Sequence, residues 1–76
     1  SELSNSEKLQ RLADQFSLTQ RETEVFGLLV NTEDGLQTIA DSLYVSRRTL
    51  ERYVSAIYKK TGAKSRIGLV TLYNNA

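Results

Sequence analysis

Four polar side chains near the middle of the chain have the types and spacing of an anion-binding surface. If residues 47–61 form a helix with 100° between successive residues, these side chains fall in one stripe about 60° wide: Arg48, Arg52, Ser55 and Lys59. The opposite side of this helix carries Leu50, Val54 and Ile57, which predicts a buried face there. Exposed guanidinium and ammonium groups donate hydrogen bonds to phosphates and other anions. An ordinary solvated basic face is the alternative that charge alone leaves open.

The distribution of charge along the chain also indicates an anionic partner. The 76 residues carry a formal net charge of only +1. This value hides an imbalance, because residues 46–76 hold seven bases and one acid, whereas residues 1–45 hold three bases and eight acids. The C-terminal part therefore has a net charge of +6, which favours a polyanion as its partner.

The composition excludes several other kinds of chemistry. The chain has no cysteine and no histidine, so it lacks the thiolate and imidazole groups that often serve in catalysis and metal binding. The closest carboxylate pairs, Glu22 with Glu24 and Glu33 with Asp34, have spacings typical of solvated or helix-capping acids. We therefore expect no enzyme activity, no metal or other cofactor and no small-molecule site. The longest apolar run, Val25–Val30, is far shorter than the roughly 20 residues that span a bilayer, so we expect no membrane contact.

The elements that must position the stripe are all predicted to be helices. Apolar residues recur at the helical period over residues 6–16, and either Ser4 or Ser6 can cap this short first helix. Thr19 begins a capping-box pattern at the start of the second helix. The turn-forming residues Asn31–Gly35 end that second helix.

A short helix and a tight turn come directly before the stripe. We expect a helix over residues 36–43, with Asp34 as its cap, followed by the turn Tyr44–Val45. Ser46 is a good cap for the helix over residues 47–61. Two helices joined by so short a turn form a helix-turn-helix, in which the second helix can enter the major groove of DNA.

Four blocks of the chain resemble the LuxR/GerE (NarL/FixJ-type) DNA-binding domain. They follow one another in the order and near the spacing of that family, over roughly residues 18–72: Leu18–Val25, Ile39–Leu43, Val45–Leu50 and Lys60–Arg66. The resemblance implies an all-α, small four-helix helix-turn-helix domain over residues 18–76. Residues 1–17 would then form an N-terminal linker or an additional short N-terminal helix. The implied function is sequence-specific binding of double-stranded DNA, as the output domain of a bacterial transcriptional regulator such as a response regulator.

The same resemblance assigns roles to individual positions. The residues expected to contact bases are Arg48, Glu51, Arg52 and Ser55. The residues expected to contact phosphates are Ser46, Arg47, Thr49, Lys59, Lys60, Lys64 and Arg66. Base contacts would select the DNA sequence, and phosphate contacts would hold the domain in place.

The predicted last helix could join two copies of the chain. It covers residues 66–73, after Gly62 as the end of the preceding helix and Ser65 as its own cap. Its apolar circumference is wider than packing on a single domain requires. We therefore expect a homodimer surface formed by Ile67, Val70 and Asn74, although a helix wedged deeply into its own domain is an equal alternative.

Two other functions fit the sequence less well. RNA-polymerase sigma factor region four also combines a similar opening motif with a helix-turn-helix, but the block Lys60–Arg66 and the last helix favour the LuxR side. The domain could alternatively be a protein-interaction module whose basic helix docks on an acidic partner.

RNA polymerase is a further expected partner of a regulator. The chain begins at Ser1 without a signal segment, which suggests a processed chain or a piece of a longer protein in the reducing cytoplasm.

Overall fold

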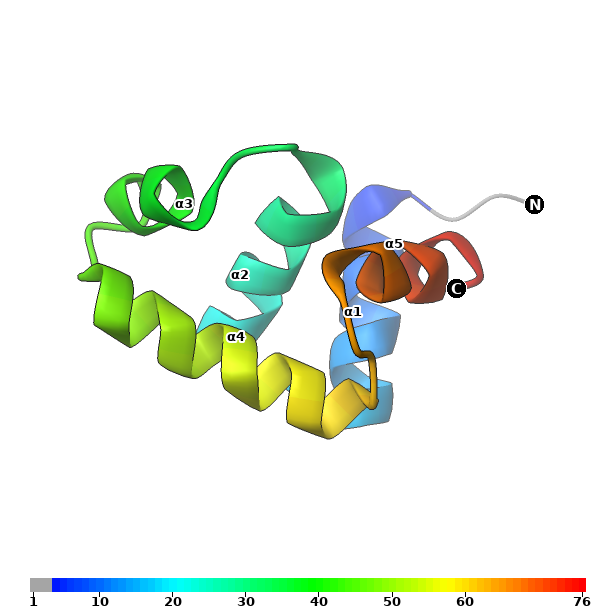
Figure 1. Ribbon diagram of the computed structural model, residues 1–76. Coiled ribbons are helices and arrows are strands. Elements are labelled where there is room, and N and C mark those ends of the chain that lie inside the picture. The colour runs from blue at the N-terminus through cyan, green and yellow to red at the C-terminus, as the bar shows by residue number, and fades with distance from the viewer. Residues whose placement is uncertain (1–3) are drawn as a thin grey trace.

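The computed structural model describes residues 4–76 and is all-helical over them (Figure 1). The five helices are α1 (Asn5–Phe16), α2 (Gln20–Asn31), α3 (Leu36–Ser42), α4 (Arg47–Thr61) and α5 (Arg66–Asn74). The expected fold class, a small helix-turn-helix domain with an additional N-terminal helix, is confirmed.

The first two helices begin at capping boxes. Ser4 Oγ accepts a hydrogen bond from the Glu7 N–H, and the Glu7 carboxylate accepts one from the Ser4 N–H. At α2, Thr19 Oγ1 and the Glu22 carboxylate make the same reciprocal pair, at 3.2 and 2.9 Å. Each box satisfies two backbone N–H groups that a helix start leaves unpaired. Ser4, rather than Ser6, is therefore the cap of α1, and the box predicted at Thr19 is confirmed.

The hydrophobic core is built around α2, which packs against both α4 and α5. In Figure 1 this helix lies in the middle of the molecule, behind α4. The largest fully buried side chains come from four helices: Val25, Phe26 and Leu29 of α2, Ile39 of α3, Leu50 and Ile57 of α4, and Leu69 of α5. Because α4 buries only one of its sides in this core, its other side faces solvent.

The turn between α3 and α4 contains a tyrosine in a backbone conformation that glycine usually adopts. Tyr44 has a φ of 58°. Its N–H donates to the Asp41 carbonyl at 3.2 Å, and the Val45 N–H donates to the Ala40 carbonyl at 3.0 Å. This pair of bonds is the Schellman motif, which closes the end of a helix. The side chain of Tyr44 is 96% exposed, so the turn gains little from burying the ring.

The start of α3 differs from the expectation. Gly35 occupies the cap position and makes no side-chain capping bond, so the prediction that Asp34 caps this helix is wrong. The Asp34 N–H instead donates to Thr32 Oγ1 at 3.3 Å, which folds the preceding loop on itself. A seven-residue helix without a side-chain cap has little stability of its own and depends on its tertiary contacts.

The additional helix α1 packs against α2 and α5. Its Leu9 lies over Gly27 of α2, where an added Cβ would be only 3.1 Å from Leu9 Cδ1. The Lys8 ammonium lies 5.3 Å from the centre of the Tyr73 ring, a cation–π contact with α5. In Figure 1, α1 is next to α5 and far from α3, so it supports the core without covering the helix-turn-helix.

Candidate nucleic-acid interface

The predicted stripe on α4 is exposed on the side opposite the core. Leu50 and Ile57 are fully buried, whereas the four stripe residues are all exposed: Arg48, Arg52, Ser55 and Lys59. Within residues 4–76, the three cations of the stripe have no hydrogen-bond or ion-pair partner. Their charged groups are therefore available to an external anion.

The N-terminus of α4 presents two hydroxyl groups that bond to each other. Ser46 caps the helix by accepting a hydrogen bond from the Thr49 N–H at 3.1 Å, as predicted. Its own hydroxyl donates to Thr49 Oγ1 at 2.9 Å. Nearby, Arg47 Nε and Glu51 Oε2 lie 3.4 Å apart, with both side chains about half exposed. Such an exposed pair contributes little to stability, so either group can exchange its partner for a ligand.

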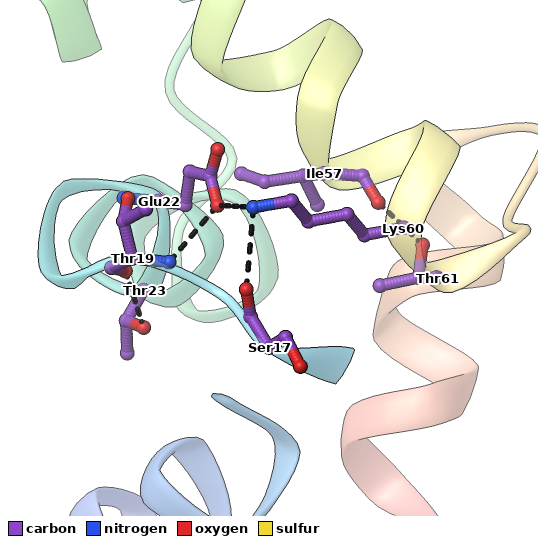
Figure 2. A network of polar contacts seen from close by, with 7 residues as sticks. All are labelled: Ser17, Thr19, Glu22, Thr23, Ile57, Lys60 and Thr61. Carbon is purple, nitrogen blue, oxygen red and sulfur yellow. Dashed lines mark hydrogen bonds and ion pairs between the residues drawn. The ribbon is translucent and has the colours of Figure 1, made fainter. Parts of the chain in front are cut away.

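Lys60 has a different environment from the stripe residues (Figure 2). Its ammonium donates to Glu22 Oε1 at 2.6 Å and to the Ser17 carbonyl at 3.2 Å. The Glu22 residue is only 7% exposed, and the Lys60 side chain is 33% exposed. The network connects the last turn of α4 to the first turn of α2 and to the end of α1. Sequence reasoning missed this connection because 38 positions separate the two charged residues.

The ionisation of Glu22 depends on these contacts. Burial raises the pKa of its carboxyl, but hydrogen bonds from Lys60 and Thr19, together with the charge of Lys60, lower it by more. The pKa of Glu22 therefore lies below its ordinary value of 4.5. At neutral pH the carboxylate is ionised, and it serves both the α2 capping box and the Lys60 ammonium.

Arg66 also makes intramolecular contacts, at the other end of α2. Its Nε donates to the Leu29 carbonyl at 2.8 Å, its Nη2 to the Thr32 carbonyl at 2.7 Å and its Nη1 to the Asp34 carbonyl at 2.5 Å. The first of these acceptors belongs to the last turn of α2, where a cation also interacts favourably with the helix dipole. The other two lie in the loop that leads to α3.

The remaining predicted residues lie around the end of α4 and on α5. Gly62 ends α4 with a φ of 78°, as expected, and Lys64 is exposed in the connection that follows. Ser65 caps α5 by accepting a hydrogen bond from the Gly68 N–H. On α5, Leu69 and Tyr73 are buried, whereas Ile67 is 77% exposed and Val70 is half-buried. Asn74 is exposed at the end of the same helix.

Residues 4–76 contain neither a cluster of metal-ligating side chains nor a long apolar helix. This part of the chain has no group of three or more acidic side chains that could hold a metal ion. None of its helices is long and apolar enough to cross a membrane.

The comparison with known families agrees with the geometry of α3 and α4. The family described as bacterial regulatory proteins, luxR family, matches residues 16–73. No curated protein and no solved structure matches the chain. The matched segment contains α2 to α5 almost completely and leaves most of α1 outside. The chain thus belongs to the luxR family of bacterial regulatory proteins, a family of DNA-binding helix-turn-helix domains.

Proposed function

We propose that this domain binds double-stranded DNA in a sequence-specific way, with α4 in the major groove. The observation that carries the proposal is the exposed set of cations on α4, which have no partner among residues 4–76 and lie directly opposite its buried residues. An α-helix fits the major groove, where the edges of the base pairs differ in their hydrogen-bonding groups. The N-terminus of α4 would lie close to the phosphates, which its free N–H groups and positive dipole end favour.

The proposed contacts divide into two groups. We assign base contacts to Arg48, Glu51, Arg52 and Ser55, in which an arginine can bond to guanine and a carboxylate can accept from cytosine. We assign phosphate contacts to Ser46, Arg47, Thr49, Lys59 and Lys64. Lys60 and Arg66 are left out of this group because their nitrogens already bond to acceptors within the domain.

Selection of bound duplexes from a random pool tests the proposal directly. A DNA-binding domain should enrich one short motif, and its affinity for that motif should fall steeply with salt. With about three phosphates neutralised by Arg47, Lys59 and Lys64 of each copy, log K should decrease against log salt with a slope of about −3. Weak binding that is independent of salt and sequence would instead favour a protein partner. Enrichment of promoter elements only in the presence of RNA polymerase core would favour the sigma-factor alternative.

We also propose that two copies associate through the exposed side of α5. Ile67, which is 77% exposed, and the half-buried Val70 line a shallow hollow on this helix. The other residues of its lining are Leu29, Thr32, Glu33 and Arg66. Asn74 lies one helical turn beyond Val70 and would border the contact. Sedimentation of the parent chain should show a dimer, and Val70→Glu should convert it to a monomer. Monomers for both proteins at high concentration would contradict the dimer.

The place of the domain in a regulator is part of the same proposal. We infer that it is the output domain of a response regulator and acts on transcription near RNA polymerase. A chain that binds chromosomal DNA would act in the bacterial cytoplasm. The domain can be expressed together with a reporter gene that carries the selected motif upstream of its promoter or within it. Higher or lower reporter expression would then distinguish activation from repression.

A further inference from the structure

We propose that Lys60 and Arg66 are positioning residues of the DNA-binding surface, each holding one helix of the helix-turn-helix against α2. The inference rests on the proposed function and changes the role expected for these two cations. The sequence predicts that both residues contact phosphates, but in the structure their charged groups donate hydrogen bonds to acceptors inside the domain. Their contribution to binding would come through the placement of α3 and α4.

Arg66 holds the loop that leads from α2 to α3. The loop between α2 and α3 contributes two of its three carbonyl acceptors, Thr32 and Asp34. The third, Leu29, belongs to α2, so one planar guanidinium joins the loop to the end of that helix. Because α3 has seven residues and no side-chain cap, its start depends on these bonds and on the packing of Leu36 against the core. Only arginine presents several N–H donors in one rigid plane, so lysine should not replace it here.

Lys60 holds the C-terminal half of α4 against α2. Its ammonium bonds to a carboxylate on α2 that is almost completely buried, and to a carbonyl that follows α1. A partly buried charged pair of this kind loses much when one partner is removed, because the other charge stays desolvated. Figure 2 shows both contacts at the end of α4. They fix how α4 lies across α2, and the direction of the exposed stripe depends on that placement.

The two cations act on opposite ends of the same helix. Lys60 bonds to Glu22 in the first turn of α2, and Arg66 bonds to Leu29 in its last turn. Both arrangements match the helix dipole, with an acid at the N-terminus and a cation at the C-terminus. These bonds direct both charged groups toward α2 and the segments next to it, so each cation acts first on the helix that it holds.

Salt-dependent DNA binding separates positioning from phosphate contact. The variants Lys60→Gln, Arg66→Gln and Arg66→Lys are compared with Lys59→Gln and Lys64→Gln, which remove exposed cations nearby. For each protein, the melting temperature and the slope of log K against log salt are measured with the selected duplex. A phosphate contact contributes about 0.9 to that slope, whatever it does to stability.

For the two positioning residues, we expect the melting temperature to fall by about 5 °C or more while the slope stays unchanged. Affinity should decrease about three- to tenfold at every salt concentration, so the plots of log K against log salt for variant and parent should be parallel. Arg66→Lys should show the same thermal loss although it keeps the charge. The exposed controls should show the reverse, with a slope smaller by about 0.9 and a melting temperature within about 2 °C of the parent.

Amide hydrogen exchange gives a local measurement that does not depend on DNA. Arg66→Lys should reduce protection first in α3, and Lys60→Gln should reduce it first in the C-terminal half of α4. A smaller slope for Lys60→Gln or Arg66→Gln at unchanged melting temperature would overturn the proposal, as would unchanged protection in α3 and α4. If the parent chain binds no duplex, the proposed function fails, whereas the thermal and exchange results still decide whether these residues position the helices.

Discussion

Lys59 and Lys60 are consecutive residues of α4, but their ammonium groups have opposite environments. Lys59 lies in the exposed stripe and has no partner within the described residues, whereas Lys60 bonds to the buried Glu22 carboxylate. A rotation of 100° about the helix axis separates the two positions. One step along the sequence therefore moves a cation from the outer surface to the flank that contacts α2.

This difference shows why a count of basic residues overestimates a phosphate-binding surface. Exposed cations keep their hydration, and when they bind a polyanion they replace its condensed counterions, whose release favours binding. Lys60 and Arg66 have already exchanged water for carboxylate and carbonyl oxygens, so they contribute mainly to the folded state. Three predictions test this division and one tests the turn that joins α3 to α4, in order of decreasing expected effect.

Arg52→Ala should give the largest loss on the exposed side. We expect about 1–3 kcal/mol lower affinity for the selected duplex and a relaxed preference at one base pair, because a bidentate bond to guanine is lost. Competition binding against duplexes altered at each position measures both effects. Arg52→Lys is the matched control, since it should lose the preference but keep the salt slope. Equal weakening on every duplex would make Arg52 a phosphate contact instead.

Glu22→Gln should give a clear loss of stability on the side that faces α2. Glutamine can keep the capping box, so the change removes mainly the ion pair with Lys60. We expect about 1–2 kcal/mol lower stability at pH 7, measured by urea unfolding. Because the pKa of Glu22 is lowered in the folded state, its stabilisation is complete well above pH 4.5 and is lost as the pH falls below that value. The parent and the variant should therefore converge in acid, and a constant difference across that range would contradict the assignment.

Tyr44→Gly should stabilise the domain by a smaller amount. Glycine adopts the left-handed conformation without the penalty of about 1–2 kcal/mol that other residues have, and it loses part of this gain to its greater freedom in the unfolded chain. We expect a net increase of about 0.5–1 kcal/mol in the free energy of unfolding. Ser17→Gly, at the other left-handed non-glycine residue, is the matched comparison. A loss of stability at position 44 would show that the exposed ring makes a contact that the turn requires.

Glu51→Gln should have the smallest effect on the fold. The Arg47–Glu51 pair is about half exposed, so stability should change by less than about 0.5 kcal/mol. Removing an acid from the proposed DNA surface should raise affinity for unrelated duplexes about two- to threefold at low salt. Anisotropy titrations on a duplex without the selected motif measure this, and lower affinity there would argue against placing Glu51 at the DNA.

Most of the secondary structure was predictable from local sequence. The helices and the caps at Thr19, Ser46, Gly62 and Ser65 follow from short-range hydrogen bonds and the helical period, which act within a few residues. The same period predicts that the stripe faces solvent, because it lies opposite Leu50, which is fully buried. The exception is the cap of α3, where Asp34 has a suitable side chain but the loop geometry places Gly35 at the helix start.

The sequence alone determined which residues are helical, where most helices begin and end, and which side of α4 faces solvent. Only the tertiary structure decided which cations are free, because that depends on carbonyls and a carboxylate from segments more than 30 positions away. It also decided that Tyr44 takes a left-handed conformation, since the packing of α3 against α4 requires the bend whatever residue is there. Local patterns cannot specify such contacts, because they form only when distant helices pack together.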